Sequence, residues 1–121
     1  RGLYDTIMPD VKYCGGVTAM RKIAELAAKH NVQTAPHNPT GPICSLASVQ
    51  SCIAGTGCDF LELQVGESTL FTEAVHGQSP VFANGHFTAP TQIGIGATLD
   101  ETVLRAHPYA PVTGGLDPSL G

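Results

Sequence analysis

The first half of the chain alternates between strand-like and helix-like segments, which limits the folds that it can adopt. Short apolar runs bounded by Pro, Asn or Gly predict strands, and apolar residues at helical spacing predict helices. The predicted strands are Leu3–Val11, Val32–Ala35 and Phe60–Gln64, and the predicted helices run from an N-cap at Thr18 to His30–Asn31 and from Ile43 to Ile53. This order indicates parallel β/α units.

One ionisable residue stands at or near the end of each predicted strand. These residues are Asp10, His37 and Glu62. Parallel strands of β/α units carry functional residues at their C-terminal ends. Each residue also has an ordinary alternative: Asp10 as a turn former, His37 as a loop residue, and Glu62 as the solvent-facing member of an alternating strand. Their occurrence in order, one per strand, favours a shared site.

The second half has a different pattern. Asn84-Gly85 separates Val81–Ala83 from His86–Thr88 and predicts a hairpin, because both turn positions tolerate positive φ. We expect a short helix or an irregular turn over Thr69–Val75 and a loop over Pro90–Gly96. A further short helix is expected within Leu99–Ala106, capped by Thr98 or Asp100.

Composition excludes several classes of partner. The chain has 121 residues, 42% of them hydrophobic and 13% charged, with a net charge of −4. A nucleic-acid or anionic-membrane partner requires a basic face, and no apolar run approaches the roughly 20 residues of a membrane span. We therefore expect no nucleic acid and no membrane. The cysteine pattern favours a reducing, cytoplasmic location. The four cysteines, Cys14, Cys44, Cys52 and Cys58, form no C-x-x-C pair and are expected to be small buried residues.

Two motifs resemble a known family. They are P-D-V-K-Y-C-G-G, from Pro9 to Gly16, and P-H-N-P-T-G-P-I, from Pro36 to Ile43. Together with Glu62 and the closing segment Phe87–Asp100, they resemble the mandelate racemase/muconate lactonizing enzyme family of the enolase superfamily, most closely the galactonate-type sugar-acid dehydratases. One departure is Ile93, where the family usually has Pro.

The resemblance implies an α/β fold that is only part of a protein. Residues 1–66 would be units 6 to 8 of a (β/α)8-type barrel, which needs about 250 residues. Residues 67–121 would close the barrel and return into an α+β capping domain. The apolar faces of these strands would then lack their neighbours, so we expect the 121 residues alone to fold poorly or to associate.

The resemblance also implies the chemistry. His37 would be the general acid, or the acid/base on one face of the substrate. Asp10 would fix its tautomer, and Glu62, protonated, would face the oxygen of an enediolate. Asn38 and Thr40 would contact substrate hydroxyls. The substrate would be a small carboxylate, and the cofactor Mg²⁺, with ligands expected outside this chain and none within it. The full-length enzyme is expected to be a homo-oligomer.

Two alternatives remain open at this point. A racemase, epimerase or cycloisomerase of the same superfamily would use the same Asp10–His37 pair without losing water. An inactive fragment or interaction module would keep the motifs without catalysis. The residues that would separate these functions lie mostly outside this chain.

Overall fold

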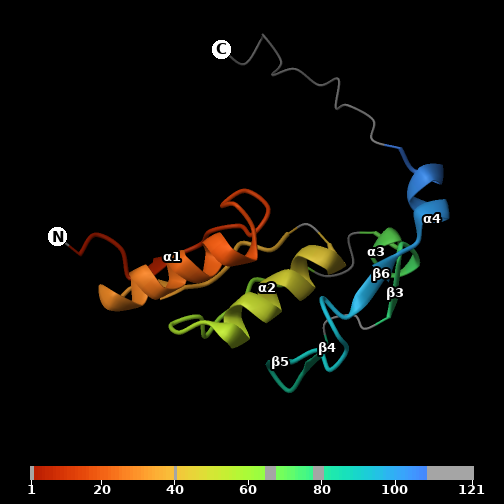
Figure 1. The fold of residues 1–121 in the computed structure, drawn as a ribbon. Coiled ribbons are helices and arrows are strands. Elements are labelled where there is room, and N and C mark those ends of the chain that lie inside the picture. The colour runs from red at the N-terminus through yellow and green to blue at the C-terminus, as the bar shows by residue number, and fades with distance from the viewer. Residues whose placement is uncertain (1, 40, 65–67, 78–80, 109–121) are drawn as a thin grey trace, which may run out of the picture.

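The computed structural model describes residues 2–39, 41–64, 68–77 and 81–108. Figure 1 shows two long helices lying side by side at the N-terminal end and several short elements at the other. The elements in the first part are β1 (Thr6–Ile7), α1 (Val17–Lys29), β2 (Gln33–Thr34) and α2 (Pro42–Ala54). Those in the second part are α3 (Leu70–Glu73), β3 (Val75–Gly77), β4 (Val81–Ala83), β5 (His86–Thr88), β6 (Ala97–Leu99) and α4 (Glu101–Ala106).

Strands β1 and β2 form the parallel pair that the sequence predicts. Thr6 is opposite Gln33 and Ile7 is opposite Thr34. Beyond the strands, Asp10 and His37 form an isolated parallel bridge. The pairing therefore sets the ends of both segments beside each other, and this is what positions the site.

The parallel unit differs from the prediction in the length of its strands. The expected strand over Leu3–Val11 is regular only at Thr6–Ile7. The expected strand over Phe60–Gln64 is not a regular strand, because a strand requires a ladder of hydrogen bonds. The backbone bond that links this segment to the preceding strand end runs from the Glu62 N–H to the Pro36 carbonyl at 3.4 Å.

Helix α1 follows the predicted spacing but begins earlier than expected. Its buried face is formed by Met20, Ala24 and Ala27. The N-cap is Gly16, at φ 87°, and not Thr18, which lies inside the first turn. A cap at φ 87° is in the region that glycine adopts without steric cost, so the glycine pair decides the start. The helix ends as predicted, with Asn31 left-handed at φ 57°.

The buried face of helix α2 consists mostly of small residues. Pro42 occupies the first turn, where its missing N–H costs nothing. The buried side chains are Cys44, Ser45, Leu46, Ser48, Val49 and Ser51. Cys44 joins Val11 and Met20 in the hydrophobic core, with Cys14 and Ala47 packed against it. Small residues allow α1 and α2 to approach closely, and the core therefore sits between these helices and the segment after β1.

The cysteines depart from the prediction at two positions. Cys52 and Cys58 form a disulfide with a Cα–Cα distance of 5.0 Å. The last turn of α2 and the turn that follows fold the chain back over six residues, which brings the pair together. The expectation of an unpaired, buried thiol is therefore wrong for both. Of the unpaired cysteines, Cys44 is buried and Cys14 is half-buried.

The second part combines a predicted hairpin with a strand pair that the sequence did not suggest. Strands β4 and β5 pair around Asn84-Gly85 as expected. Strand β3 pairs with β6 in antiparallel register, with His76 opposite Thr98. A Cβ at Gly77 would lie 2.7 Å from the Gly96 carbonyl oxygen, so this close approach requires glycine.

Helix α4 lies within the predicted span, and it starts at Glu101 because Leu99 belongs to β6. Asp100 is its N-cap and accepts from the N–H groups of Thr102 and Val103.

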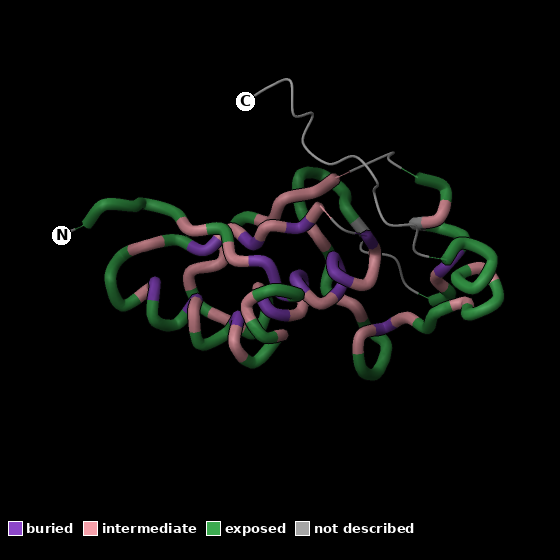
Figure 2. The backbone as a smooth tube through the Cα atoms, turned by 90° about the horizontal axis from the view of Figure 1, so that it is seen from above, coloured by how far each residue is buried: buried purple, intermediate pink, exposed green. Residues whose placement is uncertain are grey.

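Burial is concentrated in the first part of the chain. Figure 2 shows most of the buried stretches on the segment that includes α1 and α2. Among the described residues after Ser51, only Ala74 and Gly96 are buried. No helix in the described ranges is both long and apolar enough to cross a bilayer. The expected division between residues 66 and 67 lies outside the described residues.

Candidate active site

A histidine and an aspartate meet at the ends of the two parallel segments. The His37 Nδ1 atom lies 3.0 Å from the Asp10 Oδ2 atom. An ionised carboxylate only accepts hydrogen bonds, so Nδ1 carries the proton and donates it to Asp10. This contact orients the ring and leaves Nε2 free to gain or release a proton. The His37 side chain is 43% exposed, so its ring is accessible from outside the described chain.

Asp10 is held as a carboxylate by several contacts. Its side chain is only 5% exposed, and the Lys12 backbone N–H donates to Oδ1 at 2.8 Å. The Lys12 ammonium lies 3.6 Å from Oδ2. Burial alone would raise the pKa of Asp10, but the hydrogen bonds from His37 and from the Lys12 backbone, together with the charges of both residues, lower it below its ordinary value. Asp10 is therefore ionised at neutral pH.

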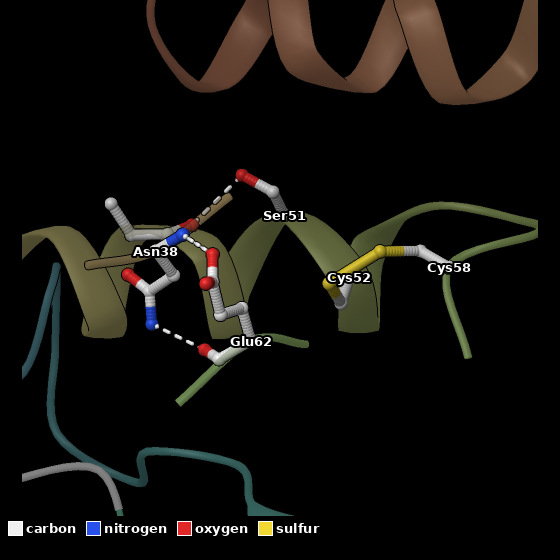
Figure 3. The surroundings of a disulfide bond; sticks show 6 residues. Asn38, Ser51, Cys52, Cys58 and Glu62 are labelled. Atoms are coloured by element: carbon white, nitrogen blue, oxygen red, sulfur yellow. Dashed lines mark hydrogen bonds between the residues drawn. A yellow bond between two sulfur atoms is a disulfide. The ribbon is translucent and has the colours of Figure 1, made fainter. Parts of the chain in front are cut away.

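Glu62 contacts Asn38, the residue that follows His37 in the sequence. Its Oε2 atom accepts a hydrogen bond from the Asn38 backbone N–H at 3.0 Å, as Figure 3 shows. Because Asn38 directly follows His37, this contact ties the segment of Glu62 to the end of β2. The three ionisable residues predicted from the strand ends are thus gathered at one end of the parallel unit.

Asn38 is turned into the protein. It is 1% exposed, and its amide donates to the Ser45 Oγ atom and to the Glu62 carbonyl, both at 3.0 Å. This geometry favours a structural role for its side chain, joining β2, α2 and the segment of Glu62. Substrate contact by Asn38 stays a prediction, and Thr40 lies outside the described residues.

Replacing Asn38 with Ala is expected to destabilise the protein by about 1–3 kcal/mol, because buried partners lose their hydrogen bonds. Urea unfolding of the full-length polypeptide, as isolated from its source, would measure this change. Glu25→Ala, which breaks the exposed Arg21–Glu25 pair, is the control and is expected to cost less than about 1 kcal/mol. Equal stability of Asn38→Ala and the unsubstituted protein would contradict the structural role.

The described residues do not form a magnesium site. No group of three or more His, Cys, Asp or Glu side chains among them is arranged to hold a metal ion. Magnesium prefers octahedral oxygen ligands, and Asp10 is already engaged by His37 and Lys12. The described side chains therefore do not fit the ion, and no chemical step is assigned to it through them.

The chain belongs to the enolase C-terminal domain-like family, because the model of this family matches residues 1–103. The mandelate racemase/muconate lactonizing enzyme relationship expected from the two motifs is thus confirmed, as is the α/β fold of a partial barrel.

Similar proteins include several sugar-acid dehydratases. D-xylonate dehydratase of Haloferax volcanii is 34% identical over 103 residues, which cover 85% of this chain and 25% of that protein. D-mannonate dehydratase of Rhizorhabdus wittichii is 32% identical over 111 residues, covering 90% of this chain and 27% of that protein. This chain therefore spans about a quarter of the length of these curated relatives.

Solved structures of the family share the fold. The mandelate racemase/muconate lactonizing enzyme of Jannaschia sp. CCS1 has a TM-score of 0.79 and 31% identity, covering 88% of this chain and 27% of that one. A structure from Burkholderia xenovorans, named for an L-alanine-DL-glutamate epimerase and bound to magnesium and fumarate, has a TM-score of 0.78 and 27% identity. It covers 86% of this chain and 25% of that chain.

Proposed function

We propose that this chain supplies the general acid, His37, and its partner Asp10 to a magnesium-dependent enzyme that removes water from a sugar acid. The observation that carries the proposal is the 3.0 Å contact between His37 Nδ1 and Asp10 Oδ2 at the ends of adjacent parallel segments. The names of the similar dehydratases support sugar acids as the substrate class.

In this mechanism His37 donates a proton to the leaving hydroxyl group. Removal of the proton next to the substrate carboxylate gives an enediolate, and the hydroxyl on the neighbouring carbon then leaves as water. His37, protonated at Nε2, donates to that hydroxyl. Asp10 keeps the ring oriented and stabilises the imidazolium form. The base that removes the α-proton is expected outside this chain.

Glu62 would face the oxygen of the enediolate. Its Oε2 atom is occupied by the Asn38 N–H, which leaves Oε1 for the substrate. A hydrogen bond from Oε1 to an enediolate oxygen requires the protonated carboxyl. The Asn38 contact fixes the direction of the carboxyl group, which is a condition for such a role.

The magnesium requirement belongs to the same proposal. When bound, the ion would supply positive charge to the developing enediolate. Its presence in the similar epimerase structure supports this requirement, with ligands outside this chain. A small-carboxylate partner, homo-oligomerisation of the full-length polypeptide and a cytoplasmic location are also part of the proposal.

The first test is the intact mass of the polypeptide as isolated from its source. We expect a mass near 40 kDa, since a complete barrel with a cap requires well over 250 residues. This polypeptide is then incubated with Mg²⁺ and with xylonate, mannonate or galactonate. The expected product is the 2-keto-3-deoxy acid, measured by NMR.

Other outcomes separate the remaining functions. Exchange of the α-proton with D₂O without loss of water would indicate a racemase or epimerase, which the name of the similar Burkholderia structure also suggests. A mass of 12.5 kDa with neither exchange nor product would indicate a fragment without catalysis.

A further inference from the structure

We propose that Lys12 is a positioning residue of the Asp10–His37 pair, setting its proton affinity by sharing the Oδ2 atom of Asp10 with His37. The inference rests on the proposed function for its effect on catalysis. It rests on geometry alone for its effect on Asp10. Lys12 is two residues from Asp10 and was not among the residues that the strand ends predict.

The turn after Asp10 brings Lys12 back to the carboxylate. The N–H groups of Tyr13 and Cys14 donate to the Asp10 carbonyl, and the Lys12 N–H donates to Oδ1. These bonds fold residues 10–14 into a tight turn, so the Lys12 side chain starts next to the carboxylate. A Lys side chain is otherwise flexible, and here the backbone restricts where it can reach.

Two contacts hold the ammonium group in this position. The Lys12 Nζ atom lies 3.6 Å from Asp10 Oδ2 and 4.5 Å from the centre of the Tyr13 ring. A cation over an aromatic face gains electrostatic attraction. The Lys12 side chain is 33% exposed, while that of Asp10 is 5% exposed, so water screens this ion pair only in part.

The shared oxygen gives Lys12 an effect on both partners. A fixed positive charge beside Oδ2 favours the ionised carboxylate and weakens its attraction for a proton on His37. Removing the charge would make proton binding to the Asp10 carboxylate easier. The Asp10 carboxyl should therefore titrate at higher pH when Lys12 is replaced by a neutral residue.

Other titratable groups nearby have different partners. The Cys14 thiol lies close to the Val11 and Gly16 carbonyls, at 4.0 and 3.9 Å. Cys44 is buried on α2, and Glu62 accepts from the Asn38 N–H. Among the described side chains, His37 and Lys12 are the ones in ion-pair contact with Asp10.

Lys12→Met tests the proposal in the protein as isolated. With ¹³C-labelled aspartate, NMR would follow the carboxyl of Asp10, whose titration midpoint is expected to rise because the neighbouring positive charge is gone. With a substrate and Mg²⁺, the limb of the pH–rate profile that belongs to the general acid is expected to move upward. Lys12→Arg keeps the charge and should restore the original values. Lys22→Met, which removes a charge from the exposed side of α1, should change neither.

The outcomes distinguish this inference from the proposed function. If no substrate is turned over, the proposed function fails, while a raised Asp10 midpoint still supports the action of Lys12. An unchanged Asp10 midpoint in Lys12→Met, or an equal change in Lys22→Met, would overturn the inference. So would a normal pH–rate profile in an active Lys12→Met enzyme.

Discussion

His37→Asn is expected to lower the rate of water loss from the sugar acid by about 10²–10⁴-fold, the usual contribution of a positioned general acid. The asparagine side chain cannot deliver a proton to the leaving hydroxyl. Because the His37 ring is 43% exposed and makes its contact with Asp10 at one edge, the fold should survive the change. Steady-state kinetics with Mg²⁺ and the substrate found by screening would measure the loss.

The chain contains a matched control for this substitution. The His76 Nε2 atom lies 2.8 Å from Asp100 Oδ2, so His76 is also a histidine paired with an aspartate, but at the β3–β6 end and 66% exposed. His76→Asn should leave the rate within about twofold, because His76 does not act as the general acid.

Proton exchange gives a second measurement on the same variant. If the α-proton is removed by a base outside this chain, His37→Asn should still exchange that proton with D₂O while failing to form product. A variant that folds normally and keeps nearly full turnover would remove His37 from the mechanism.

The location of the dyad could be predicted because it depends on a short-range rule. Strands in a parallel unit end at the same edge, so Asp10 and His37 are neighbours once the helix over residues 17–29 is recognised. The spacing of Met20, Ala24 and Ala27 made that helix easy to recognise. The position of Glu62 followed from the same rule, although its segment does not form a regular strand.

Features that depend on distant or precise geometry could not be predicted. The pairing of β3 with β6 joins segments about twenty residues apart, and neither has a strong strand pattern. The Cys52–Cys58 disulfide depends on how the turn after α2 folds back. The approach of Lys12 to Asp10 depends on the turn itself. A Lys two residues after a strand-end Asp was the available signal.

The 121-residue polypeptide produced alone is expected to associate or to unfold without a sharp transition. Several large apolar side chains are more than half exposed in the described chain, among them Leu3, Tyr4, Met8, Phe60 and Phe82. A cavity of about 340 Å³ also opens between α2, residues 58–61 and the β4–β5 hairpin, lined by Val49, Ile53, Phe60, Leu61, Phe82 and Phe87. Exposed apolar surface on this scale marks a missing partner surface or a tendency to aggregate.

The distribution of buried residues explains why the part of the chain after Ser51 should be the less stable one. Beyond Ser51, Ala74 is the only buried apolar side chain among the described residues, so the short strands there have almost no core of their own. Light scattering and thermal unfolding would test the expectation. Phe60→Ser with Phe82→Ser should reduce association, whereas Tyr13→Ser, at the dyad turn away from the cavity, should not. A monomer with a single cooperative transition would show instead that the core between α1 and α2 is sufficient, and the need for the missing barrel units would then be catalytic rather than structural.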